Sequence, residues 1–163
     1  MDNHLVLAAL GADRTGIVDE ISRIASETRC NITDSRMVVM GQEFSIIMMI
    51  SGAWDAIAKF ENHIPVLEQR LNLAIITKRT EARQPQREAI PYRVDVIALD
   101  NPGIVHDIAN FFASQQINIE SLETSTYAAP HTGSPMFALN MMVNIPAKAH
   151  LASLREKIGR AHV

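Results

Sequence analysis

Two segments of the sequence combine an aspartate, a glycine and a predicted helix start, and together these could hold a small zwitterion. They read GADRTGIV at residues 11–18 and DNPGIV at residues 100–105. Free N–H groups at a helix N-terminus attract a carboxylate, and the neighbouring Asp13 or Asp100 can accept hydrogen bonds from an ammonium group. Asn101 suits an N-cap, Pro102 the first helical position, and a glycine lets a backbone or ligand approach closely. A capped helix start without a ligand would look the same, so both interpretations stay open.

An asparagine opens a predicted strand in both halves of the chain. Asn31 precedes Ile32, and Asn118 precedes Ile119. An asparagine side chain both donates and accepts hydrogen bonds, so it could bind the main-chain groups of a ligand. It could equally stabilise a turn.

No sequence pattern indicates a reactive cysteine, a metal site, a nucleotide-binding loop or a serine nucleophile. Cys30 is the single cysteine, has no activating signature around it, and is predicted to be a small buried thiol. The six histidines form no metal-ligand spacing such as HxxxH. P-loop, GxGxxG and GxSxG motifs are absent. The sequence therefore predicts no catalytic residue, no metal site and no cofactor, and hence no enzyme.

Composition favours a cytoplasmic protein that does not bind nucleic acid or a membrane. The 163 residues carry a net charge of −3, and no apolar stretch approaches the roughly 20 residues of a membrane span. The N-terminus has no basic region or cleavage site of a signal peptide. One cluster mixes four basic with two acidic side chains and is expected to be a solvated linker: Lys78, Arg79, Glu81, Arg83, Arg87 and Glu88.

The sequence contains an internal repeat. Residues 10–32 align without a gap to residues 97–119, so that Gly16 recurs as Gly103, 87 positions later. Further on, Phe44 recurs as Phe137, 93 positions later. The six added residues fall in the segment AAPHTG, which a hairpin loop tolerates.

Each copy is predicted to be an α+β unit of the ferredoxin-like type, β-α-β-β-α-β, with its first and third strands central. In copy one, residues 1–80, Pro65 is expected to bend or interrupt the second helix. The elements expected there are strands 4–10, 32–40, 43–51 and 72–79 and helices 16–28 and 54–67. A polar linker at 81–91 leads to copy two at 92–163, with strands 92–99, 118–127 and 136–144 and helices at 102–115 and from about 147.

Copy two is expected to lack its last strand, which would leave the edge of strand 92–99 unpaired. The final residues, IGRAHV at 158–163, match one translated frame of a common sequencing adapter. We therefore expect that the gene was truncated in assembly near Glu156; a natural or engineered short end is the alternative.

The repeat, the loop ALGADRTGIV and the block CNITDSRMVVMGQEFSIIMMISGAW resemble ACT domains. The second block and IITKRT make copy one similar to the tandem ACT repressors that control glycine cleavage genes in proteobacteria, and copy two follows more loosely. Thr15 departs from the proline common in such loops, which predicts a less rigid turn.

This resemblance implies a regulatory, amino-acid-sensing protein whose ligand lies where two ACT modules pack together. It implies that glycine is the ligand, and that the protein contacts a LysR-type activator without touching DNA; a homodimer is compatible with it. The implied ligand-binding residues are Asp13, Arg14, Thr15, Gly16, Ile17, Asn31, Ile32, Asp100, Asn101, Pro102, Gly103, Ile104, Asn118 and Ile119. Two alternatives remain: a detached regulatory ACT region of an amino-acid or folate enzyme, and a dimerisation module without a ligand.

Overall fold

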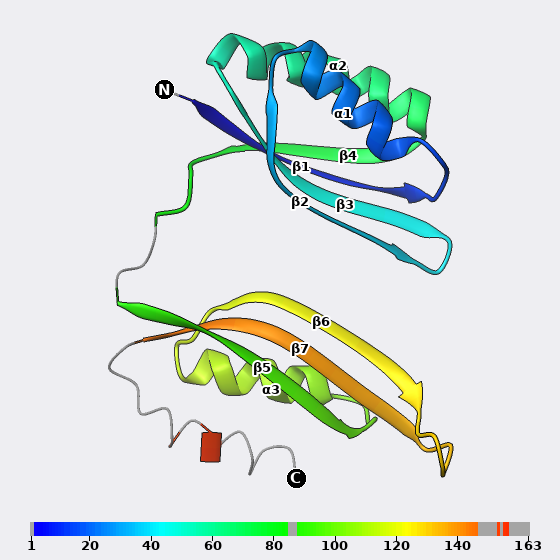
Figure 1. The fold of residues 1–163 in the computed structure, drawn as a ribbon, viewed down its shortest axis with the longest axis vertical. Coiled ribbons are helices and arrows are strands. Elements are labelled where there is room, and N and C mark those ends of the chain that lie inside the picture. Colours follow the sequence, from blue (N-terminus) through cyan, green and yellow to red (C-terminus); the bar gives the residue numbers. More distant parts are fainter. Residues whose placement is uncertain (1, 85–87, 147–152, 154, 157–163) are drawn as a thin grey trace. The chain divides into compact units, whose positions relative to one another are not determined.

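The computed structural model describes residues 2–84, 88–146, 153 and 155–156. It divides the chain into two compact units, Met1–Gln84 and Pro85–Val163, which we call the first and second modules (Figure 1). No helix in the described ranges has the length and apolar character needed to cross a lipid bilayer.

The first module has the predicted β-α-β-β-α-β order. Its elements are β1 (Asn3–Ala12), α1 (Ile17–Glu27), β2 (Asn31–Met40), β3 (Glu43–Gly52), α2 (Trp54–Leu71) and β4 (Leu73–Thr80). The strands pair antiparallel in the order β2-β3-β1-β4, which confirms that the first and third strands are central. Both helices cover the same face of this sheet (Figure 1).

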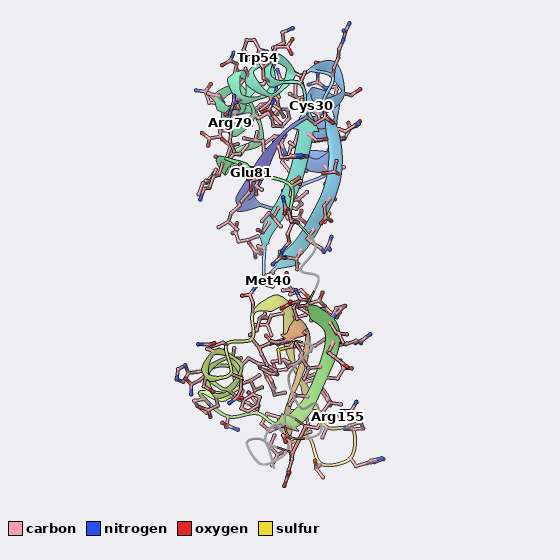
Figure 2. The ribbon with its side chains drawn as sticks, turned by 90° about the vertical axis from the view of Figure 1, so that its left-hand side faces the viewer. Cys30, Met40, Trp54, Arg79, Glu81 and Arg155 are labelled. Atoms are coloured by element: carbon pink, nitrogen blue, oxygen red, sulfur yellow. The ribbon has the colours of Figure 1, made fainter. Side chains whose placement is uncertain are left out.

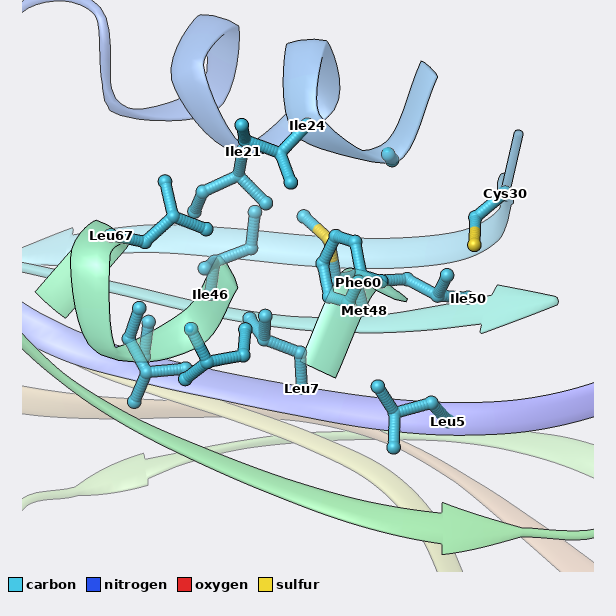
Figure 3. Close-up of a cluster of buried hydrophobic side chains, with 14 of the residues drawn as sticks. Leu5, Leu7, Ile21, Ile24, Cys30, Ile46, Met48, Ile50, Phe60 and Leu67 are labelled. Carbon is cyan, nitrogen blue, oxygen red and sulfur yellow. The ribbon is translucent and has the colours of Figure 1, made fainter. Parts of the chain in front are cut away.

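Alternating apolar residues build the core between the helices and the sheet. Leu5 and Leu7 of β1 are fully buried, and the intervening Val6 points to the helix-free face. Ile21 of α1 and Phe60 of α2 pack over them in the same cluster (Figure 3). Cys30 lies at the edge of this cluster and is 6% exposed, which confirms the predicted buried thiol.

An exposed carboxylate links the two helices. Glu20 of α1 accepts hydrogen bonds from Arg23, at 2.9 Å, and from Arg70 of α2, at 3.2 Å. The hydrogen bond from Arg23, together with Arg70, holds the pKa of Glu20 below its ordinary value of 4.5. The contribution of such exposed ion pairs to stability is small, so the apolar core carries the packing of the helices.

The expected interruption at Pro65 is wrong, because α2 runs through it from Trp54 to Leu71. Pro65 is exposed, so water can satisfy the carbonyl whose helical hydrogen bond the proline ring removes.

The second module has the order β-α-β-β in its described part. Its elements are β5 (Ala89–Leu99), α3 (Ile104–Ser114), β6 (Ile119–Ala128) and β7 (Pro135–Pro146), with the sheet order β5-β7-β6. Its core has Ile108, Phe112 and Met141 at its centre. This matches the predicted incomplete ferredoxin-like unit.

The second module starts earlier than predicted, and its predicted last helix is described only in part. The linker was expected to reach residue 91, but Ala89, Ile90 and Pro91 already pair with β7. Pro91 fits there because β5 is an edge strand in the described sheet. Of the helix expected from about residue 147, the described residues 153, 155 and 156 are helical, and the adapter-like tail 158–163 lies outside the described residues.

We expect Gly11→Ala to destabilise the first module by about 1–3 kcal/mol, because a methyl group there overpacks the sheet. A Cβ on Gly11 would lie 2.7 Å from the backbone oxygen of Asn72 and 2.7 Å from Cδ2 of Leu73. Gly52→Ala is the matched control, since its Cβ would make contacts no closer than 3.4 Å. Urea denaturation followed by circular dichroism measures both, and equal stability of the two variants would contradict this packing.

Candidate functional site

The β1–α1 turn and its counterpart β5–α3 are held by the same backbone hydrogen bond. The N–H of Asp13 donates to the carbonyl of Gln42 at 3.0 Å, and the N–H of Asp100 donates to the carbonyl of Pro135 at 3.0 Å. Each turn is thereby fixed to the hairpin end of its own sheet. We call residues 13–17 and 100–104 the loop halves of the candidate site.

Helices α1 and α3 each have a glycine with a left-handed backbone as the N-cap residue. Gly16 has φ 94° and Gly103 has φ 89°, and neither helix start has a side-chain cap. A Cβ on either glycine would meet nothing within 4 Å, so the positive φ, and not a close backbone approach, calls for glycine. Among the described residues, the glycine at each helix start supplies no side-chain hydrogen bond to the first backbone N–H groups of α1 or α3.

The predicted capping by Asn101 and Pro102 is wrong. Helix α3 begins at Ile104 with Gly103 as its N-cap, so both residues precede the helix. The side chain of Asn101 donates to the carbonyl of Leu99 at 3.3 Å instead. The left-handed glycine turns the chain into the helix, a role that the sequence pattern had given to Asn101.

The predicted residues of the loop halves differ in what they can offer a ligand. Asp13, Arg14 and Thr15 are exposed, as are Asp100, Asn101 and Pro102. Ile17 and Ile104 are buried in the two cores, at 2% and 8% exposure. Each isoleucine can therefore present only its backbone N–H to a ligand.

The other predicted residues lie at the start of the second strand in each module. Asn31 and Ile32 open β2, and Asn118 immediately precedes Ile119, the first residue of β6. A β-bulge follows at the same place in both sheets, at Thr33 and at Glu120. We call residues 31–32 and 118–119 the strand halves; bulges often re-aim side chains beside binding sites.

An open hollow of about 390 Å³ adjoins the first strand half, a volume within the range of small-molecule sites. It is lined by Ser22, Ala25, Ser26, Arg29, Cys30, Asn31 and Ile32. Sequence reasoning missed the two serines and Arg29. The serines stand four positions apart on one face of α1, a signal that gains meaning only once α1 is known to flank β2.

Within one module the loop half and the strand half lie at opposite ends of the sheet. Asn31 pairs with Ser51, which pairs with His4 near the start of β1, whereas the loop half follows Ala12 at the end of that strand. Eight residues of β1 separate these rows, which is about 26 Å. Figure 2 shows Cys30, which immediately precedes β2, and Met40, its last residue, far apart along the sheet. One small ligand can contact both halves only if they come from different ACT modules.

Residues 3–78 and residues 86–162 each match a family model described as an ACT domain. The chain is 36% identical over 156 residues to the glycine cleavage system transcriptional repressor of Escherichia coli (strain K12), covering 94% of this chain and 81% of that protein. The glycine cleavage system transcriptional repressor of Shigella flexneri has the same identity to this chain, 36% over 156 residues, and the same coverage. This chain belongs to the family of glycine cleavage system transcriptional repressors. It is a tandem ACT-domain protein of the regulatory kind.

Two solved structures share the fold of this protein over nearly its whole length. A crystal structure whose description names a glycine cleavage system transcriptional repressor is 32% identical with a TM-score of 0.73, covering 99% of this chain and 91% of that chain. An unknown protein from Galdieria sulphuraria is 25% identical with a TM-score of 0.78, covering 99% and 92%.

We expect Gly16→Ala to destabilise the repressor-family chain by roughly 1–2 kcal/mol, because alanine pays the steric cost of the left-handed backbone. Gly16→Asn is the matched control, since asparagine tolerates this conformation better. Chemical denaturation of both variants measures the difference. An alanine variant as stable as the wild type would contradict the assigned backbone conformation.

Proposed function

We propose that this repressor-family protein senses glycine, or a similarly small α-amino acid, and passes the signal to a protein partner. The observation that carries the proposal is the pair of helix starts without side-chain caps, each with an aspartate in the turn before it. A zwitterion supplies one group for each: a carboxylate for the N–H donors and an ammonium group for the aspartate. The name of the relatives, which refers to the glycine cleavage system, makes glycine the first candidate.

We propose that each ligand is held by the loop half of one ACT module and the strand half of another. The separation of these halves within one module supports this arrangement. The backbone N–H of Ile17 or Ile104 would face one oxygen of the ligand carboxylate, Asp13 or Asp100 the ammonium group, and Asn31 or Asn118 the same main-chain groups from the other side. The other predicted residues, Arg14, Thr15, Gly16, Ile32, Asn101, Pro102, Gly103 and Ile119, would shape the rim.

The proposed output is a change in contact with a LysR-type activator in the cytoplasm, without catalysis and without direct DNA binding. The net charge of −3 supports a protein partner over nucleic acid, because nucleic-acid binders usually carry a basic surface. A ligand that binds one arrangement of the ACT modules more tightly shifts the population towards it, and so changes the surface shown to the activator. Self-association into a homodimer is part of this proposal, since a second copy also supplies ACT modules.

Isothermal titration calorimetry of the full chain tests the proposal with glycine, serine, alanine and leucine. We expect glycine to bind and leucine, with its large side chain, not to bind. A thermal shift assay with the same amino acids gives an independent readout, because a ligand of the folded state stabilises it. No heat and no thermal shift with any of the four would overturn the proposal.

A further inference from the structure

The two strand halves differ at the bulge that follows them. Thr33 in the first module and Glu120 in the second occupy corresponding positions of the repeat, and each is the bulged residue. One module therefore has a neutral hydroxyl where the other has a carboxylate.

In the second module this carboxylate engages the predicted ligand-binding asparagine. Glu120 Oε1 accepts a hydrogen bond from Nδ2 of Asn118 at 3.3 Å and another from Nδ2 of Asn144 at 2.7 Å. The side-chain amides of Asn118 and Asn144, which could have donated to a ligand carboxylate, therefore already donate to a carboxylate of the protein. A second carboxylate arriving there would meet the charge of Glu120 as well.

In the first module the corresponding asparagine is available. Thr33 donates its hydroxyl to the carbonyl of Met49 at 3.4 Å and leaves Asn31 untouched. Within the part of the chain that the structure describes, the side chains of Asn31 and Arg29 have no hydrogen-bond or ion-pair partner, and both line the hollow beside β2.

The lining of this hollow also differs between the modules. Ser22, Ser26 and Arg29 line it in the first module. The repeat places Ala109, Ala113 and Gln116 at the corresponding positions of the second. The first module therefore offers two hydroxyls and a cation where the second offers two methyl groups and an amide.

We infer that the two modules are not equivalent: the first strand half, through Asn31 and Arg29, binds the ligand carboxylate, and in the second Glu120 stands in its place. This inference rests on the proposed function and makes Arg29 a specificity-determining residue that selects an α-carboxylate. A carboxylate has two oxygens, so it can accept from Asn31 and Arg29 while it also faces the helix start of another ACT module. One glycine then binds per chain.

Calorimetry with glycine on three single variants of the full chain tests this inference. Asn31→Ala and Arg29→Gln should each weaken binding by about tenfold or more, the effect expected for a lost hydrogen bond to a charged group. Asn118→Ala is the discriminating comparison: two equivalent modules predict that it weakens binding as Asn31→Ala does, whereas the inferred asymmetry predicts the wild-type affinity and stoichiometry. Arg29→Gln is compatible with the backbone, because Arg29 has φ 62° and Gln116 holds φ 57° at the same place.

The outcomes separate this inference from the proposed function. If the wild-type chain binds none of the amino acids, the proposed function fails. If it binds glycine but Asn118→Ala weakens binding as much as Asn31→Ala, or two glycines bind per chain, the inference alone is overturned. Unaltered binding in Arg29→Gln would also overturn it. Thermal unfolding without ligand confirms that each variant is folded before its affinity is compared.

Discussion

The direction of the chain through β1, α1 and β2 constrains everything that this protein can do with a small ligand. Because α1 returns along the sheet, the turn that starts it and the asparagine that starts β2 lie at opposite ends of the strands. The packing of Ile21 and Phe60 over the sheet holds that arrangement, since α1 cannot shift along its axis without leaving the core. In the proposed function, amino-acid sensing depends on association between ACT modules, so that ligand binding and module association form one linked equilibrium.

In the proposed function, this linkage connects glycine binding to the contact with the protein partner. A ligand held by two modules binds the arrangement in which they meet more tightly, and so stabilises that arrangement. The asymmetry between Thr33 and Glu120 adds a further element. With the inferred asymmetry, a chain with one competent strand half binds one glycine.

Much of the fold could be predicted from the sequence, because the signals are local or repeated. The alternation of Leu5 and Leu7 and the spacing of Ile21 and Ile24 specify a strand and a helix, and the repeat specifies them twice. The errors arose where backbone geometry overrides side-chain preference. Asn101 and Pro102 have the chemistry of a helix start, but Gly103 with its positive φ sets the boundary. Pro65 predicts a bend or an interruption of the helix, and the interruption does not occur because its exposed position lets α2 continue.

The candidate site was predictable only in part. Its loop halves follow from the repeat, but Arg29, Ser22 and Glu120 are visible only when α1 is placed beside β2 and the bulge is located. These residues come together through the turn from α1 into β2 and the pairing of β6 with β7, and hydrophobic periodicity encodes neither.

The most direct measurement is a glycine titration of the full chain followed by the backbone amide signals in NMR. A site shared by two modules predicts that the amide signals of a loop half, at Gly16 or Gly103, and of the strand half, at Asn31, shift together with one common Kd. Shifts confined to one end of a sheet, or two ends with different Kd values, would contradict a site shared by two modules.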